Sequence, residues 1–202
     1  LSCPESFDAL TDFLTSQYHG LSKLCRVEDV IPSKKTYKIG LEAARRIEKH
    51  LPSFGLKSQE KFSSKNLFGN NCAVTLIAQY QGRDLRIKAA PMYVAPHNEG
   101  CSRVRTFYKD HYQVQKFGEN DFDFYFAALR PDHPDANRYL YAFPCDELMK
   151  HGILQTDSQP GKSMFYVYHD KCETNKKHSW ANDFKIDMHN LDQSLPWLTE
   201  AF

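Results

Sequence analysis

One stretch, residues 72–90 (CAVTLIAQYQGRDLRIKAA), constrains the fold of this chain more than any other part of the sequence. It predicts two strands joined by a turn at residues 81–82, because apolar and polar side chains alternate on both sides of that turn. The alternation places Asp84, Arg86 and Lys88 on one face of the second strand. An acid and two cations beside an apolar strand mark either a solvated edge of a sheet or a functional site, and the sequence leaves both open.

The composition fits an ordinary globular protein with one substantial core. The chain has 202 residues, of which 41% are hydrophobic and 25% are charged, and this balance excludes a disordered tail. The net charge is +1, so a basic surface that attracts nucleic acid must be local. No signal-peptide pattern and no apolar run of membrane length is visible. We therefore expect an intracellular protein without a membrane partner.

The six cysteines have no spacing typical of a metal site. They are Cys3, Cys25, Cys72, Cys101, Cys145 and Cys172. Free thiols in a reducing compartment are the favoured interpretation, and the even number leaves disulfide bonds open as the alternative.

The rest of the pattern predicts helices at the start of the chain and strands after the central hairpin. Helices are expected over residues 6–20, 36–50 and 144–151, a short strand over 55–61, and a flexible loop over 91–101. Later strands are expected over residues 103–108, 121–129, 138–143 and 164–169. In residues 121–129, alternation places Phe122, Phe124 and Phe126 on one face.

These elements predict a single α/β (α+β) domain with a mixed central sheet flanked by helices. Residues 1–35 would form a helical extension and residues 36–170 the core. Residues 171–202 would dock on this core or on a protein partner.

The order of elements over residues 36–155 resembles that of the PD-(D/E)XK nuclease superfamily, in particular its homing-endonuclease-like and restriction-endonuclease-like members. The matching pieces begin with Glu42 in a helix and the lysine-bearing strand that contains Lys88. They continue with the aspartate- and phenylalanine-rich strand near residue 121 and a strand that ends in Phe143-Pro144. The resemblance implies a restriction-endonuclease-like core.

The resemblance also implies a site that departs from the family pattern. In the family, a carboxylate two residues before the lysine holds a divalent metal, and the lysine orients or activates the attacking water. Here that position is Arg86, a cation that would repel a metal. The family also has an aspartate near the start of the preceding strand. Here the nearest polar residues are Asn70, Asn71 and Thr75, and none supplies a carboxylate.

We therefore expect a catalytically degenerate nuclease-like domain that binds nucleic acid, with DNA favoured, or that scaffolds a nucleic-acid-processing assembly. Metal and cofactor are expected to be absent. Cations along strand faces can meet successive phosphates, and the expected set is Arg86, Lys88, Arg103, Arg105 and Lys109. The competing interpretation is that these are solvated surface charges, Lys88 included.

Two other functions remain open at this stage. The first is an active Mg²⁺-dependent endonuclease in which Lys88 works with Asp84, Glu42 and Asp121 as relocated acids. Against it, a helical glutamate followed by Arg45 and Arg46 is more often an ordinary surface ion pair. The second is a protein–protein interaction module that retains the fold only as a scaffold.

Overall fold

The computed structural model describes residues 34–60, 73–95, 98–110, 113–168 and 176–202. The helix expected over residues 6–20 lies outside these ranges, as does most of the remaining N-terminal extension. No helix within the described ranges is long and apolar enough to cross a membrane.

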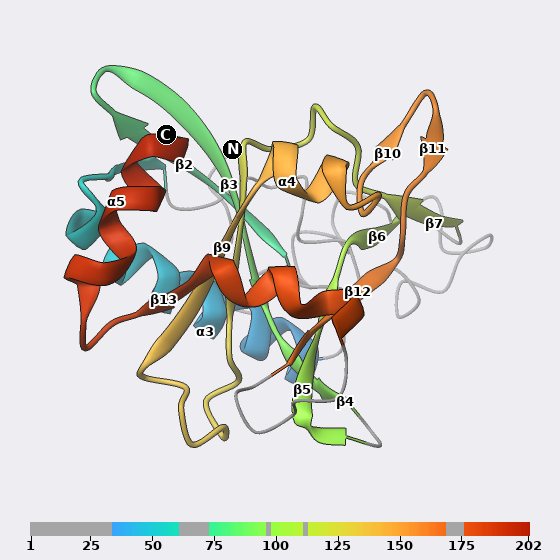
Figure 1. The fold of residues 1–202 in the computed structure, drawn as a ribbon, viewed down its shortest axis with the longest axis horizontal. Coiled ribbons are helices and arrows are strands. Elements are labelled where there is room, and N and C mark those ends of the chain that lie inside the picture. The colour runs from blue at the N-terminus through green and yellow to red at the C-terminus, as the bar shows by residue number, and fades with distance from the viewer. Residues whose placement is uncertain (1–33, 61–72, 96–97, 111–112, 169–175) are drawn as a thin grey trace, which may run out of the picture.

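A six-stranded mixed sheet forms the centre of the fold (Figure 1). Its strands, in spatial order, are β1 (Lys57–Glu60), β2 (Val74–Tyr80), β3 (Arg83–Pro91), β8 (Phe124–Ala128), β9 (Tyr139–Pro144) and β13 (Lys185–Asp187). Neighbouring strands are antiparallel except for β3 and β8, which are parallel. This arrangement confirms the predicted α+β class with a mixed central sheet.

The predicted hairpin is present as β2 and β3. Its two turn residues, Gln81 and Gly82, have φ values of 48° and 85°. Positive φ at both central positions is typical of the type I′ turn, whose twist matches that of the flanking strands. The turn fixes the register between β2 and β3, so that Thr75 lies opposite Lys88.

Helices cover one face of this sheet. Helix α3 (Lys34–His50) is followed by the 3-10 helix η1 (Leu51–Phe54), and α5 (Leu191–Ala201) lies nearby at the left of Figure 1. The buried residues of these helices form one apolar cluster with side chains from the sheet. That cluster includes Ala44, Ile47, Leu51, Leu76, Leu85, Ile87, Phe126 and Leu198. We call the covered surface the helical face.

The opposite face carries a second apolar cluster and is covered by more varied elements. A smaller sheet has the order β12 (Met164–Tyr168), β5 (Asn98–Arg105) and β4 (Tyr93–Ala95). Around it lie the hairpins β6 (Phe107–Asp110)–β7 (Gln113–Lys116) and β10 (Gln155–Thr156)–β11 (Gln159–Pro160), helix α4 (Cys145–Lys150) and the 3-10 helix η3 (Lys176–Phe184). We call this surface the insertion face, because most of its cover lies between β3 and β8 or after β9.

Two expectations about local structure are wrong. Residues 91–101 contain β4 and the start of β5 instead of a flexible loop, because their backbone groups pair in the smaller sheet. Phe122 does not share a face with Phe124 and Phe126. It packs against Phe117 and Tyr125 in the second cluster, since regular alternation begins only at residue 124.

Two of the six cysteines lie in the described ranges and test the thiol prediction. Cys101 and Cys145 are buried, and neither forms a disulfide bond with another described cysteine. Cys3, Cys25, Cys72 and Cys172 lie outside the described residues.

Candidate functional site around Arg86 and Lys88

The two cations of β3 lie on the insertion face. Leu85 and Ile87 belong to the apolar cluster under the helices, so the residues between and after them point to the other side of the sheet. Lys88 lies between Thr75 of β2 and Tyr125 of β8, near the middle of the sheet. The predicted alternation thus holds along β3.

Lys88 is buried, which shows that the interpretation as a surface lysine is wrong. The residue is 4% exposed. Its Nζ donates a hydrogen bond of 3.1 Å to Thr75 Oγ1 and lies 4.9 Å from the centre of the Phe117 ring. Burial lowers the pKa of Lys88 to about 8, and the negative charge of Asp121 acts in the opposite direction. An amine with a pKa near 8 exchanges its proton more readily at neutral pH than a solvated lysine does.

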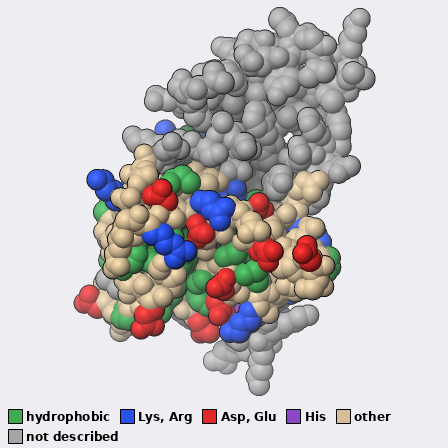
Figure 2. Space-filling model, turned by 90° about the horizontal axis from the view of Figure 1, so that it is seen from above, with side chains coloured by type: hydrophobic (Ala, Val, Ile, Leu, Met, Phe, Trp, Pro, Cys, Tyr) green, Lys and Arg blue, Asp and Glu red, His purple; other side chains and the backbone are tan. Residues whose placement is uncertain are grey.

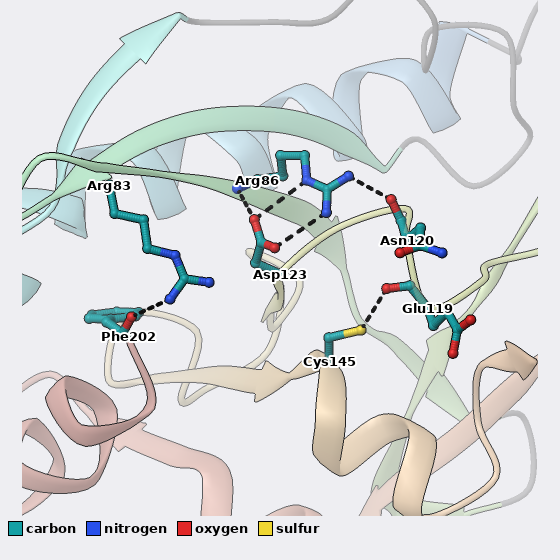
Figure 3. Close-up of polar contacts among 7 residues, drawn as sticks. All are labelled: Arg83, Arg86, Glu119, Asn120, Asp123, Cys145 and Phe202. Carbon is teal, nitrogen blue, oxygen red and sulfur yellow. Dashed lines mark hydrogen bonds and ion pairs between the residues drawn. The ribbon is translucent and has the colours of Figure 1, made fainter.

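Arg86 is engaged by an acid. Its Nη2 lies 3.3 Å from Asp123 Oδ1, and its Nη1 donates to the carbonyl of Asn120 at 2.6 Å. The backbone N–H of Arg86 also donates to Asp123 Oδ2 at 2.7 Å. Figure 3 shows the guanidinium and this carboxylate pointing toward each other. The Arg86 side chain remains 45% exposed, so solvent or a ligand reaches it.

The backbone holds Asp123 in place on both sides. Its N–H donates to the carbonyl of Arg86 at 2.8 Å, and its carbonyl accepts from Cys145 N–H at 2.9 Å. Cys145, the first residue of α4, directs its Sγ to the carbonyl of Glu119 at 3.2 Å (Figure 3). Burial raises the pKa of this thiol to about 11, and nearby acids add to the effect. Arg86 is thus paired with an acid fixed by the sheet.

The acids expected beside Lys88 in an active nuclease are not brought together with it. Glu42 is on α3, which packs on the helical face, opposite to Lys88. Asp84 is exposed, opposite Gln79 near the hairpin turn, and four residues of extended strand separate it from Lys88 by roughly 13 Å. Asp121 is the one acid of this set that acts electrostatically on Lys88. It is exposed, and its Oδ2 accepts the N–H of Gly118 at 2.7 Å.

The other expected cations lie outside the main sheet. Arg103 and Arg105 are in β5, which pairs with β4 and β12 and not with the central hairpin. The Arg105 guanidinium lies 4.3 Å from the centre of the Tyr93 ring. Lys109 is in β6, opposite Val114 of β7. These residues would extend the Arg86 and Lys88 surface directly only if their strand lay beside the hairpin. It does not.

The residues present do not fit a divalent metal. No group of three or more His, Cys, Asp or Glu side chains within metal-binding reach occurs in the part of the chain that the structure describes. Arg86, a cation, already neutralises the nearest fixed acid, Asp123. Mg²⁺ needs oxygen ligands in near-octahedral geometry, which these side chains do not supply.

The surface charge is mixed. Figure 2 shows Lys and Arg side chains separated by Asp and Glu, with hydrophobic side chains between them, on the face seen from above. This distribution agrees with the net charge of +1. On this face (Figure 2), the described residues therefore offer a polyanion a few placed cations and no broad basic surface.

Sequence reasoning did not identify the partners of the two cations. The sequence left Asp123 open as a metal ligand or as an acid that solubilises an exposed strand face, and it indicated no role for Phe117 or Asn120. No signal in the sequence marks Asn120, because it contributes a backbone carbonyl. The register of the parallel pair β3 and β8 places Asp123 beside Arg86, and that register joins residues 37 positions apart.

In the main sheet, three antiparallel strands follow helix α3, and the third of them is parallel to a fourth. The solved structure of a bacterial homing endonuclease, I-Ssp6803I, is similar to this chain with a TM-score of 0.54 and 12% sequence identity, over 82% of this chain and 96% of that one. At this identity the likeness concerns the fold alone.

A second similar structure is the crystal structure of MepB, with a TM-score of 0.48 and 17% identity over 66% of this chain and 87% of that one. No protein-family model and no curated protein sequence matches the chain.

Proposed function

We propose that this nuclease-like domain binds nucleic acid without metal-dependent cleavage, and that DNA is the first ligand to test. The observation that carries the proposal is the position of Arg86. A half-exposed guanidinium lies where the resembled family has a metal-binding acid. A guanidinium cannot hold a metal, but it pairs well with a phosphate through two parallel hydrogen bonds.

The Asp123 carboxylate would act as a stand-in for phosphate when the ligand is absent. It holds the Arg86 guanidinium through Nη2 and, at 3.5 Å, through Nε. The pair is partly solvated, with side chains 45% and 25% exposed, so exchanging the carboxylate for a phosphate costs little. The guanidinium is thereby held in place before the ligand arrives, which lowers the entropic cost of binding.

Lys88 would support the site without contacting phosphate. At 4% exposure, its amine cannot reach a bulky polyanion, and its hydrogen bond to Thr75 ties β3 to β2 beneath Arg86. Arg103 and Arg105 would supply additional phosphate contacts from the smaller sheet. The likeness to a protein named as an endonuclease supports nucleic acid as the ligand.

The test is fluorescence anisotropy with labelled duplex DNA, and with RNA of the same sequence, over a series of salt concentrations. Arg86→Ala is expected to weaken binding about tenfold and to reduce the slope of log K against log salt by about 1. Arg83→Ala is the matched control. It removes the same charge from the same strand, but Arg83 points away and donates to the carbonyl of Phe202 (Figure 3). It should change the affinity only slightly.

Asp123→Asn sharpens the test, because it removes the competing negative charge while it keeps an acceptor for the backbone N–H of Arg86. Binding should become tighter. Equal losses in Arg86→Ala and Arg83→Ala would contradict the proposal, and so would binding that does not depend on salt.

A plasmid assay with Mg²⁺ or Mn²⁺ tests the second half of the proposal. We expect no nicking. Nicking that Lys88→Ala abolishes would show an active nuclease instead. Failure to bind DNA or RNA, together with a stable co-purifying protein, would favour the protein–protein interaction module.

A further inference from the structure

A pocket of about 200 Å³ lies at the end of the main sheet, away from the Arg86 and Lys88 site. Helix α3 forms one wall, with Glu42 and Arg46. The end of β3 and the segment after β8 form the other, with Pro91, Leu129, Arg130 and Asn137. A pocket of this volume holds several water molecules. A small ion or the headgroup of a larger ligand therefore fits inside.

Two arginines give this pocket unused hydrogen-bonding capacity. The Nε atoms of Arg46 and Arg130 are buried and have no hydrogen-bond partner among the residues that the structure describes. Native proteins pair nearly all buried polar groups with protein or water. Two unpaired donors of the same kind in the lining of one pocket therefore call for an acceptor from outside the described residues, a water molecule or a ligand.

The remaining groups of the two arginines are held in place. Arg46 Nη2 donates to the carbonyl of Leu129, which ties α3 to the end of β8. Arg130 Nη2 pairs with Asp132 Oδ2 at 2.7 Å. Each guanidinium is thus fixed at one nitrogen while its Nε remains unpaired.

The wall that carries Arg130 and Asn137 is an ordered turn. His133 N–H donates to the carbonyl of Arg130 at 2.9 Å, and Ala136 N–H donates to the carbonyl of His133 at 3.0 Å. His133 Nδ1 accepts from Asp135 N–H at 3.1 Å. These bonds hold the rim of the pocket in one shape before a ligand binds, which reduces the entropic cost of binding.

The charges that line the pocket favour an anion. The lining holds two guanidinium groups and one carboxylate, Glu42, whereas Asp132, the ion-pair partner of Arg130, lies outside the lining. Burial lowers the pKa of Arg46, and Glu42 opposes this effect, but arginine stays charged at any physiological pH. A phosphate has more acceptor oxygens than a carboxylate does, so it can accept hydrogen bonds from both guanidinium groups at once.

We propose that the pocket between α3 and the turn after β8 binds a phosphate group, held between Arg46 and Arg130. The phosphate could come free in solution or from the 5′ end of a nucleic-acid strand, and both sources present the same chemistry to the two arginines. The apolar part of the lining, Pro91 and Leu129, would contact whatever carries the phosphate. The inference does not depend on duplex binding at Arg86.

Isothermal titration calorimetry with inorganic phosphate, and with acetate as the comparison anion, tests the site. Arg46→Gln and Arg130→Gln should each weaken phosphate binding about tenfold or more, since each removes a charge-assisted hydrogen bond. Glu42→Gln should tighten it, because it removes the negative charge in the lining. Arg45→Gln is the matched control: it is the exposed neighbour of Arg46 on the same helix and should bind as the wild type does.

Arg46→Gln loses a bond that ties α3 to the sheet, so its fold should be checked by circular dichroism. Arg130→Gln and Glu42→Gln keep the test valid if that variant unfolds. Absence of phosphate binding would overturn the proposal, and so would acetate binding as tight as phosphate binding or an Arg130→Gln variant with unchanged affinity.

Oligonucleotides with and without a 5′-phosphate distinguish the two sources. A preference for the phosphorylated strand that Arg130→Gln abolishes would assign the pocket to strand ends. Equal binding of the two strands, with inorganic phosphate bound as before, would assign it to free phosphate. If phosphate binds while duplex DNA does not, the proposed function fails and this inference stands.

Discussion

The two faces of the main sheet contrast in what they bury. The helical face is continuous and apolar, with Leu76, Leu85 and Ile87 fully buried under α3 and α5. On the insertion face, strand β3 buries Lys88 and leaves Arg86 half exposed beside Asp123. The difference teaches that strand β3 serves two purposes. Leu85 and Ile87 hold the fold together, whereas Arg86 and Lys88 carry polar groups on the other face at a cost in stability.

The largest effect on stability is expected when a buried side chain of the helical face is shortened. Leu76→Ala should lower the free energy of unfolding by about 2–5 kcal/mol, because Leu76 is fully buried and its removal leaves a cavity. Ile77→Ala is the matched control on the next residue of β2, whose side chain is only partly buried on the other face. It should cost less than half as much. Urea unfolding followed by circular dichroism measures both, and equal losses would erase the contrast between the faces.

The second effect is the pH dependence that Lys88 introduces. Its pKa is about 8 in the folded protein, lowered from its ordinary value of 10.5. Below pH 8 the amine is charged in both states, and the folded state carries the full cost of burying that charge. Between about pH 8 and pH 10.5 the unfolded state binds more protons than the folded state does, so the free energy of unfolding rises with pH.

Lys88→Met removes this contribution while it keeps an unbranched side chain. From about pH 7 to about pH 10, the stability of the wild type relative to Lys88→Met should rise by roughly 2–3 kcal/mol. The comparison between the two proteins cancels the groups that they share, such as Cys145. A stability difference that stays constant with pH would show that Lys88 is solvated.

The smallest effect concerns the Arg86–Asp123 pair, which is partly solvated. Arg86→Ala should change the free energy of unfolding by less than about 1 kcal/mol, as is usual for an ion pair near the surface. Asp123→Ala should cost more, about 1–2 kcal/mol, because its carboxylate also accepts the backbone N–H of Arg86. Thermal unfolding at low and high salt separates the two contributions. An Arg86→Ala variant that is the more destabilised of the two would contradict this order.

Much of the fold could be predicted from local patterns. The period of two along residues 74–89 and the Gln81-Gly82 turn predict the central hairpin, and the structure has both. The helix expected over residues 36–50 matches α3, which begins at Lys34. These elements are decided by neighbours in the sequence. Residues 91–101 were misinterpreted because their two prolines, one glycine and one asparagine are typical of loops, whereas pairing with β12 and within β4 and β5 makes strands of them.

The candidate site could be predicted only in part. Alternation correctly placed Arg86 and Lys88 on one face, but it could not show that Lys88 is buried, because burial depends on Phe117 and the other insertion elements above it. Nor could it show that Glu42 lies beyond the opposite face, since the side of the sheet on which a helix packs depends on the chain's path in three dimensions.

By itself, the sequence determined the mixed α+β class, the hairpin, and the presence of two cations, Arg86 and Lys88, on one face of its second strand. The tertiary structure decided which groups meet: Asp123 with Arg86 through the parallel register of β3 and β8, and Arg46 with Arg130 across a pocket. The physical reason is the distance along the chain over which each interaction acts. Strand alternation and turn geometry act over a few residues, whereas desolvation and ion pairing depend on groups brought together from distant parts of the chain.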